Sequence, residues 1–319
     1  MQVDFSKETV AYGPATIANM GSGFDILGMA LEHPADTLWL RPVPERGIRI
    51  LSIEGDGGAL SLLPTENVAG VVLDLFSATV GYAHGWEVKL RKGLPLGSGM
   101  GSSSASSVAA LWAANVALGH PMTKLELVPL AMEGERAACG VAHADNVAPA
   151  MLGGIVLVRN YHPLDLLPLP VPVFMMVVAS PKFEIRTGDA RRVLPPTLPM
   201  QAVIAQMGQV ASLIASLYKG DIEMLGQSLT DYIAAPYRSK LLPGYDALGE
   251  RVRAAGALGF GISGSGPALF ALCAHAETAQ QVRQAFLDGY AEMGMECNVY
   301  VSGVNAEGVR TEAHAVPKI

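Results

Sequence analysis

The segment PLGSGMGSSSASS (residues 95–107) places three glycines at alternate positions and runs straight into serines. It lies between a predicted strand (residues 86–92) and a predicted alanine-rich helix (residues 105–118). The first N–H groups of a helix have no partner within it, and the helix dipole favours negative charge there. Glycines allow close approach of a phosphate, and a serine hydroxyl can also ligate Mg²⁺. A tight turn packed against backbone is the alternative, but the length and position of the run favour phosphate binding.

Two common nucleotide-binding loops do not match this segment. The pattern GxxxxGK[ST] is absent, and GxGxxG would require glycine where Ser102 stands. The missing glycine disfavours a dinucleotide-binding oxidoreductase. A second glycine-rich turn is expected at residues 259–267, where Gly264 and Gly266 either border a site or form a simple turn before a buried strand.

Strands and helices that must position these loops are mixed along the whole chain, which predicts an α+β protein. Thr123 and Glu126 form a capping-box pattern at the start of one helix. Strands are predicted at residues 36–43, 48–53, 86–92, 153–158, 171–180, 268–274 and 297–304, and helices at 67–80, 105–118, 123–139, 200–218, 244–256 and 277–293. The prolines between residues 163 and 172 are the best domain boundary, so we expect lobes at 1–167 and 168–319.

Composition excludes several classes of protein. Of 319 residues, 50% are hydrophobic and 16% are charged, so the chain can build a core and needs no disulfide scaffold. The net charge of −7 disfavours nucleic-acid binding. Cys139, Cys273 and Cys297 lack metal or disulfide spacing and are expected to be reduced thiols. The N-terminus has no signal-peptide pattern, and residues 164–179 are too proline-rich to span a bilayer, so we expect a cytoplasmic protein without membrane contact.

The loop PLGSGMGSSSA resembles the central signature P-x-x-x-G-[LM]-G-S-S-A of the GHMP small-molecule kinases. PATIANMGSGFDILGMAL (residues 14–31) and GISGSGPALFAL (residues 261–272) are similar to the other two motifs of that family, so the resemblance covers almost the whole chain. It implies a two-lobed α+β fold, with an N-terminal lobe like domain 2 of ribosomal protein S5 and a ferredoxin-like C-terminal lobe. The active site would lie in the cleft between them. Ser104 departs from the signature alanine, and because serine is also small we expect little effect.

Three segments most resemble the GHMP kinases that phosphorylate L-homoserine: ANMGSGFDILG (18–28), HADNVAPAMLGG (143–154) and PYRSKLLPGY (236–245). The resemblance implies transfer of phosphate from ATP to give O-phospho-L-homoserine and ADP, on the route to threonine. It also implies a homodimer. A kinase for mevalonate or a sugar would use the same loop, and a non-catalytic sensor of ATP and a metabolite is a further alternative.

On the nucleotide side, the resemblance implies that Ser103 and Glu135 hold Mg²⁺. Glu133 is assigned to a solvated helix face. The nucleotide itself would contact a larger set of residues: Asn67, Lys92, Pro95, Leu96, Gly97, Ser98, Gly99, Met100, Gly101, Ser102, Ser103, Ser104 and Ala105.

On the substrate side, the planar fork of arginine suits a carboxylate. By resemblance, Arg191 and Arg238 would bind the carboxylate of an amino acid, and Asn19 and Asp25 its ammonium group. The rest of the pocket would be Thr187, His143, Asp145 and Asn146.

The mechanism implied is direct in-line attack by a positioned hydroxyl without a protein base. Ser103, Glu135, Thr187 and Arg191 are therefore the expected catalytic residues. Asp145 is assigned to the substrate pocket although it resembles a base in related kinases.

Overall fold

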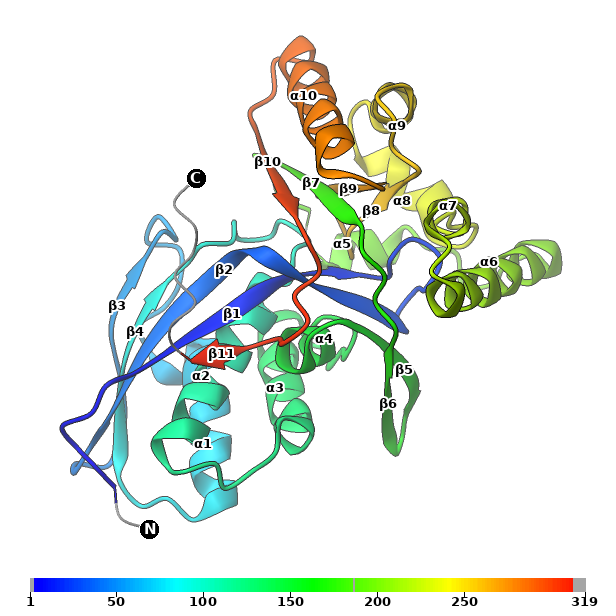
Figure 1. Ribbon diagram of the computed structural model, residues 1–319. Coiled ribbons are helices and arrows are strands. Elements are labelled where there is room, and N and C mark those ends of the chain that lie inside the picture. The colour runs from blue at the N-terminus through cyan, green and yellow to red at the C-terminus, as the bar shows by residue number, and fades with distance from the viewer. Residues whose placement is uncertain (1–2, 186, 312–319) are drawn as a thin grey trace.

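A computed structural model describes residues 3–185 and 187–311, without the side chains of Cys139 and Thr187. Two sheets, packed against helices, confirm the α+β expectation (Figure 1). The strands are β1 Thr9–Ala18, β2 Leu27–Val43, β3 Gly47–Glu54, β4 Gly85–Arg91, β5 Ile155–Tyr161, β6 Leu164–Leu169, β7 Met175–Pro181, β8 Gly259–Ile262, β9 Leu269–Cys273, β10 Cys297–Ser302 and β11 Arg310–Thr311. The α-helices are α1 Val68–Val80, α2 Ser102–Ala117, α3 Lys124–Cys139, α4 Val147–Leu152, α5 Thr187–Arg192, α6 Met200–Lys219, α7 Ile222–Gln227, α8 Ala235–Arg238, α9 Tyr245–Ala254 and α10 Ala276–Glu292.

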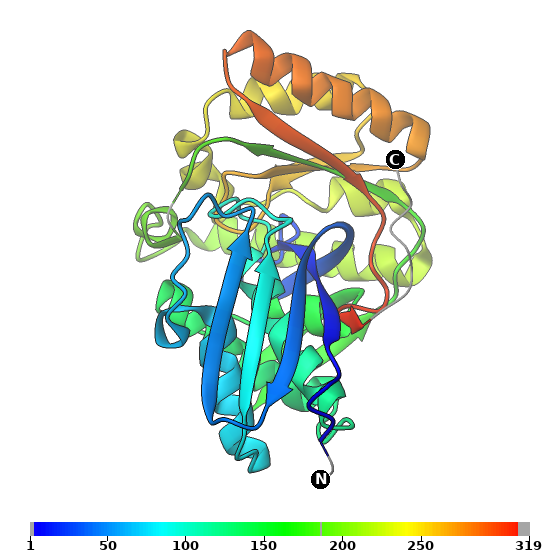
Figure 2. The same ribbon diagram turned by 90° about the vertical axis from the view of Figure 1, so that its left-hand side faces the viewer.

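The first sheet is organised around β2, which at 17 residues is longer than the predicted strand 36–43. The second half of β2, residues 37–43, pairs with β4, and its first residues, Leu27 to Met29, pair with β5. β1 runs antiparallel along most of β2, and β3 lies parallel to β4. Figure 2 shows these strands face on, with helices behind them and the second sheet above.

Helices α1, α2 and α3 cover one face of the first sheet (Figures 1 and 2). α2 lies closest because it is rich in alanine and serine, and most of its residues are buried. A Cβ at Gly13 of β1 would stand 1.9 Å from the carbonyl oxygen of Ala105, so glycine is required where the two backbones meet. The helix begins at Ser102 rather than at residue 105, because Gly101 caps it in a left-handed conformation (φ 69°). The predicted capping box of Thr123 and Glu126 is confirmed at the start of α3.

The second sheet has the order β10-β7-β9-β8, with α9 and α10 on its outer side (Figure 1). Residues 259–262, expected as part of a turn, instead form β8 and pair with β9. Gly259 and Gly261 are buried there, and a Cβ on Gly261 would lie 2.9 Å from the Phe270 ring, so the strand needs glycine for packing. The turn itself is confined to residues 263–267.

The chain passes from the first sheet to the second between Leu169 and Met175. Part of the proline-rich stretch 163–172 is itself a strand, β6, which pairs with β5. The last described strand, β11, returns to the first sheet beside β1. A separate apolar core, which includes Ile17, Met100 and Phe270, fills the space between the sheets and fixes one lobe against the other.

Candidate active site

Three glycine-containing segments that lie far apart in the sequence meet between the two sheets. The Ser263 hydroxyl donates to the Gly99 carbonyl (2.7 Å), and the Ala268 N–H donates to the Ser98 carbonyl (2.9 Å). The Gly264 N–H donates to the Ala18 carbonyl (3.2 Å), which joins the N-terminal segment to the same place. Two backbone hydrogen bonds and one from a serine side chain therefore hold together the three segments that sequence patterns had indicated separately.

A cleft of about 780 Å³ opens at this junction. Most of the predicted site residues line it: Asn19, Asp25, Asn67, Lys92, Leu96, Gly97, Ser98, Gly99, Gly101, Ser102, Ser103, Glu135, His143, Asp145, Asn146, Arg191 and Arg238. Pro95, Met100, Ser104 and Ala105 do not line it. Met100 and Ala105 are fully buried in the core between the sheets, so only their backbone could face a ligand. Thr187 begins α5, but its side chain lies outside the described residues.

At one end of the cleft, the glycine loop leads into the N-terminus of α2. Gly97, Gly99 and Gly101 all have positive φ (62°, 80° and 69°), which side chains other than glycine rarely adopt. The first intrahelical bond of α2 runs from the Ala105 N–H to the Gly101 carbonyl, so the N–H groups of residues 102–104 have no partner within the helix. The loop and helix together form an anion-binding geometry.

Asn67 and Lys92 were predicted to contact the nucleotide, but their polar atoms bond within the protein. The Asn67 amide oxygen accepts from the Ala69 N–H (3.0 Å) and caps α1, while its nitrogen donates to the Ser61 carbonyl (2.9 Å). The Lys92 ammonium is buried and ion-paired with Asp36 on β2. Lys92 nevertheless lines the cleft, so its direct contact with the nucleotide stays a prediction.

Glu135 on α3 accepts hydrogen bonds from two serines at the start of α2. Both Ser103 Oγ (2.6 Å) and Ser104 Oγ (2.9 Å) donate to its Oε1 atom. Burial raises the pKa of the Glu135 carboxyl, and the two serine hydrogen bonds oppose that rise. Ser104, expected to be a neutral departure from the signature, thus helps to hold the carboxylate. The adjacent oxygens of Ser103 and Glu135 are hard donors of the kind that Mg²⁺ prefers, so this pair fits the ion.

At the other end of the cleft, charged side chains from both lobes converge. Arg191 Nη2 lies 2.9 and 2.8 Å from the two carboxylate oxygens of Asp25. His143 Nε2 is 3.4 Å from the same Arg191 nitrogen, and burial lowers the pKa of the imidazole. Arg191 and Asp25 supply a cation and an anion side by side, which matches the two charged groups of a zwitterion.

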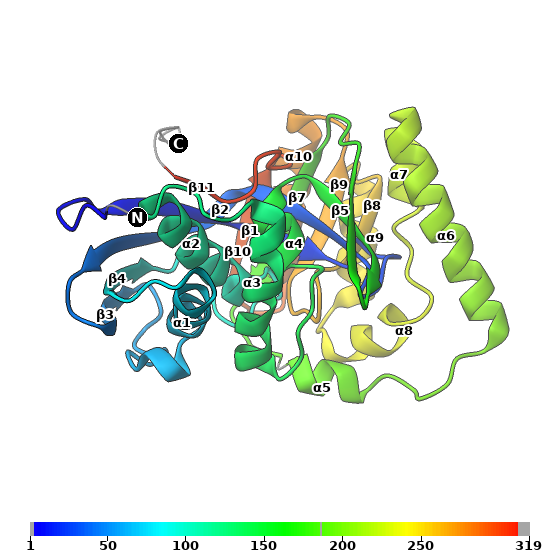
Figure 3. The same cartoon turned by 90° about the horizontal axis from the view of Figure 1, so that it is seen from below.

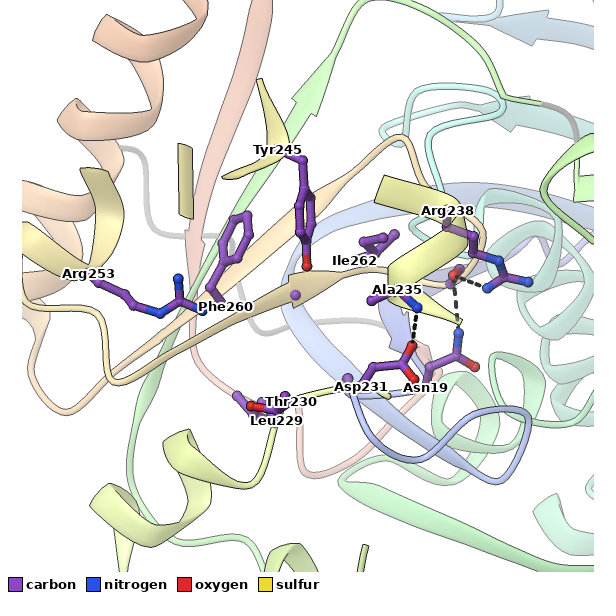
Figure 4. Close-up of a pocket in the computed structure, with 13 residues that line it drawn as sticks. Asn19, Leu229, Thr230, Asp231, Ala235, Arg238, Tyr245, Arg253, Phe260 and Ile262 are labelled. Carbon is purple, nitrogen blue, oxygen red and sulfur yellow. Dashed lines mark hydrogen bonds between the residues drawn. The ribbon is translucent and has the colours of Figure 1, made fainter. Parts of the chain in front are cut away.

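Arg238 is buried at the end of α8 and points into the cleft. Its Nη1 atom donates to the Gly264 carbonyl (2.9 Å), which also accepts from Asn19 Nδ2 (3.1 Å) (Figure 4). Burial lowers the pKa of Arg238, and the nearby Asp25 carboxylate opposes that effect. Asn19 and Arg238 also line a smaller cavity of about 90 Å³, together with Asp231 and Tyr245. Figure 4 shows the residues around this cavity.

Asp145 and Asn146 lie at the start of α4, between the two ends of the cleft. Burial raises the pKa of the Asp145 carboxyl to about 7, and the negative charges of Asp25 and Glu135 contribute. The Asn146 amide oxygen accepts from the Thr16 hydroxyl (2.6 Å), which fixes the asparagine against β1. A carboxyl with such a pKa exchanges its proton near neutral pH.

Sequence reasoning missed several residues that shape the cleft. The Phe24 ring lies 5.5 Å from the Arg191 guanidinium and 5.0 Å from that of Arg238, so it contacts both cations. The Tyr161 hydroxyl donates to the Asp25 carbonyl (2.8 Å). Neither residue carries a spacing signal. Left-handed backbone at Asn19, Met20 and Asp25 (φ 69°, 43° and 59°) concentrates strain in the same segment, which is typical of functional sites.

Two family models match the chain. The GHMP kinase N-terminal domain matches residues 67–154, and the GHMP kinase C-terminal domain matches residues 213–292. Together they span more than half of the chain, and the first includes the glycine loop, Glu135 and residues 143–146. The chain therefore belongs to the GHMP kinase family, whose members transfer a phosphoryl group from ATP to a small molecule.

Individual relatives narrow this class. The chain is 42% identical to a homoserine kinase of Chlorobium phaeobacteroides, over 95% of this chain and 99% of that one. A crystal structure of homoserine kinase from Cytophaga hutchinsonii superposes with a TM-score of 0.94 at 43% identity, covering 98% of this chain and all of that one. The chain belongs to the homoserine kinases within the GHMP family. A mevalonate kinase of L. major shares the fold alone, with a TM-score of 0.75 at 17% identity over 95% and 98% of the two chains.

Proposed function

We propose that this chain transfers the γ-phosphoryl group of ATP to the side-chain hydroxyl of L-homoserine. The products are O-phospho-L-homoserine, which feeds threonine biosynthesis, and ADP. The observation that carries the proposal is one cleft with an anion-binding loop at one end and paired arginine and carboxylate groups at the other. Near-full-length similarity to homoserine kinases supports the same substrate.

The amino-acid end of homoserine fits the polar end of the cleft. Arg191 and Arg238 bind the substrate carboxylate, and Asn19 and Asp25 bind its ammonium group. Arg191 and Asp25 are paired with each other in this structure. When the substrate binds, Arg191 would turn part of this contact toward the substrate carboxylate, and Asp25 would turn part of it toward the ammonium group. Other residues assigned to this pocket are His143, Asp145, Asn146 and Thr187.

ATP lies with its phosphates against the glycine loop and the start of α2. Backbone N–H groups of residues 102–104 face the phosphates, and the base extends toward Asn67. We assign residues 1–167 as the ATP-binding lobe and residues 168–319 as the second lobe, which contributes Arg191 and Arg238. Two parts of the second range pair with the first sheet, namely the end of β6 at Pro168 and Leu169 and the strand β11. Mg²⁺ would be held by Ser103 and Glu135, and when bound it would neutralise phosphate charge.

Chemistry in this site is an in-line displacement. The substrate hydroxyl oxygen forms a bond to the γ-phosphorus while the bond from that phosphorus to the β,γ-bridging oxygen breaks, and ADP leaves with this oxygen. The hydroxyl proton passes to an oxygen of the transferred phosphoryl group and from there to solvent, so no protein base is needed. Ser103, Glu135, Thr187 and Arg191 contribute by positioning the reactants and balancing charge. Asp145 belongs to the substrate pocket and is assigned no proton transfer.

The test is a coupled ADP-release assay with Mg-ATP and a panel of acceptors. The panel is L-homoserine, mevalonate, phosphomevalonate, galactose, L-threonine and L-serine. Strong turnover with L-homoserine alone supports the proposal. Turnover with another acceptor keeps the phosphate loop and discards the amino-acid pocket. Binding of ATP without turnover on any acceptor favours a sensor instead.

We propose a cytoplasmic homodimer, with α6 as the surface between two copies. Among the described helices, α6 is long and apolar enough to cross a membrane by length and composition, but it contacts the rest of the protein along one side at the edge of the molecule (Figure 3). Met200, Ile204, Met207 and Tyr218 are 61–71% exposed on it, at spacings of one helical face. Lys219 is the only charged residue of α6. This uncharged face of α6 therefore suits contact with the same face of a second copy of the chain.

A further inference from the structure

A buried polar cluster lies directly beneath the phosphate loop, at the edge of the cleft. Asp36 on β2 is 0% exposed, and Lys92, which follows β4, is 7% exposed. The Lys92 ammonium donates to Asp36 Oδ2, to the Ser102 carbonyl (2.8 Å) and to Ser106 Oγ (2.8 Å). An ammonium group has three protons, so these contacts leave none for a nucleotide.

The Asp36 carboxylate joins both ends of the loop. Its Oδ1 atom accepts from the N–H groups of Gly93 (2.9 Å) and Leu94 (3.2 Å), where the loop begins. Its Oδ2 atom accepts from Lys92 and from Ser106 Oγ (2.8 Å) in the first turns of α2, where the loop has ended. A single carboxylate therefore fixes the distance between residue 93 and the start of α2.

Burying a charged pair such as Lys92 and Asp36 in a protein core costs desolvation free energy. Burial lowers the pKa of Lys92, because the charged form loses its hydration, and the Asp36 charge opposes that shift. Well-packed apolar side chains often stabilise a core as well as or better than a buried ion pair. Apolar side chains cannot, however, form hydrogen bonds. The ion pair forms them with four groups in one fixed geometry: the N–H groups of Gly93 and Leu94, the Ser102 carbonyl and Ser106 Oγ. The arrangement thus points to control of loop shape.

We propose that Asp36 and Lys92 are positioning residues that close the phosphate loop from below and set the geometry in which it receives ATP. The inference rests on the proposed role of this loop in phosphate binding. Neither side chain touches the nucleotide. Their effect passes through the backbone of Gly93, Leu94 and Ser102, so it falls on ATP rather than on the amino acid at the far end of the cleft.

The test compares Asp36→Asn and Lys92→Met with the unmodified protein. We expect KM for ATP to rise about tenfold or more in each variant, since small displacements of binding groups are costly, while KM for L-homoserine changes less than about twofold. ADP affinity, measured by calorimetry, should fall in parallel. Ser77→Ala is the matched control, because it removes the partly buried acceptor of a hydrogen bond from Trp86 Nε1 (2.9 Å) in the same lobe but away from the loop.

A merely structural role predicts a lower melting temperature and an unchanged KM for ATP, as in the Ser77→Ala control, and that result would overturn the proposal. If either single variant fails to fold, the uncharged double variant Asp36→Asn/Lys92→Met and the milder Ser106→Ala replace it. Ser106→Ala keeps the ion pair and removes one bond to Asp36, so a rise of about threefold in KM for ATP is expected.

Failure of this inference can be distinguished from failure of the proposed function. Gly99→Ala alters the loop directly. If Gly99→Ala raises KM for ATP and Asp36→Asn does not, the loop binds phosphate and the positioning role is wrong. If neither variant changes KM for ATP, the loop is not the phosphate site and both proposals fall.

Discussion

Single residues in this cleft have charges that depend on burial as much as on residue type. Glu135 and Asp145 are both buried carboxyl groups, yet their surroundings differ. Burial raises the pKa of both carboxyl groups, but two serine hydroxyls donate to Glu135 and oppose that rise. Asp145 lies instead near two other negative charges, which disfavour its charged form. This contrast supports a metal-binding role for Glu135 and a substrate-pocket role for Asp145.

Replacing Glu135 tests the metal assignment. Glu135→Ala should lower kcat by about 100-fold or more, because phosphate charge would lose its bound counterion. Titration of turnover with Mg²⁺ would check the cause, since the variant should require more of the ion. Glu133→Ala is the control, because Glu133 lies on the same helix but is only partly buried and pairs with Arg136. Unchanged turnover in Glu135→Ala would contradict the assignment and weaken the case for chemistry.

Arg238 tests the carboxylate pocket. Arg238→Ala should raise KM for L-homoserine by about 100-fold, since a buried charge-assisted contact is lost, and KM for ATP far less. Arg238→Lys keeps the charge without the planar fork, so its KM for L-homoserine should lie between those of the unmodified protein and Arg238→Ala. Arg192→Ala serves as the control because Arg192 is exposed and pairs with Asp189. An equal effect of Arg238→Ala on both KM values would remove Arg238 from the amino-acid pocket.

The raised pKa of Asp145 predicts a pH-dependent stability. The folded protein keeps this proton up to about pH 7, whereas the unfolded chain releases it near the ordinary value of 3.8. Between those values the folded state binds more protons, so the free energy of unfolding falls as pH rises. Asp145→Asn should remove this fall, by up to about 4 kcal/mol between acid and neutral pH.

Urea denaturation of both proteins at several pH values from about 4 to about 8 would measure the difference. Glu133→Gln provides the comparison for a partly exposed carboxyl. Parallel pH profiles for Asp145→Asn and the unmodified protein would show that Asp145 ionises normally in the folded state.

At the scale of elements, the phosphate loop depends on its packing against the turn after β8. Gly99 has a φ of 80°, and an added Cβ would lie 2.7 Å from the carbonyl oxygens of Ser263 and Gly266. Both are backbone atoms and cannot turn away. The loop from the first lobe and the turn from the second therefore hold each other in place.

Gly99→Ala should destabilise the protein by roughly 1–3 kcal/mol through backbone strain, and should raise KM for ATP. Gly57→Ala is a matched control, since Gly57 also has positive φ (64°) but an added Cβ there would have no neighbouring atom within 4 Å. Thermal unfolding with and without ATP separates strain from loss of binding. Equal losses in the two variants, with unchanged KM, would show that the contact with the turn is unimportant.

At the scale of the whole molecule, the exposed face of α6 predicts association. Ile204→Asp/Met207→Asp should convert a dimer to a monomer, because two negative charges would be buried in an uncharged interface. Light scattering after size-exclusion chromatography gives the mass of each species. Leu63→Asp is the control, since Leu63 is 59% exposed in a different part of the molecule. A monomer for the unmodified protein at micromolar concentration would contradict the proposal.

Elements with strong local signals could be predicted from the amino-acid sequence alone. The alternation in β4, the apolar spacing in α6 and α10, and the capping box of α3 each depend on neighbours along the chain. The glycine loop and its serines were likewise recognisable, because a strand-loop-helix junction is a local feature. For the same reason the family motifs could be found without a structure.

Which of these features meet in space depends on the tertiary structure. Lys92 stands just before the loop, where the family pattern has a nucleotide ligand. In the structure its ammonium group instead pairs with Asp36, 56 residues away, in the core. The bond from Ser104 to Glu135 and the contact of Phe24 with two arginines likewise join residues from different elements. β8 forms where a turn was expected because Gly261 packs against Phe270 and Gly259 against Gly226 and Leu229. Such contacts depend on how elements pack in space, and sequence spacing carries no record of that packing.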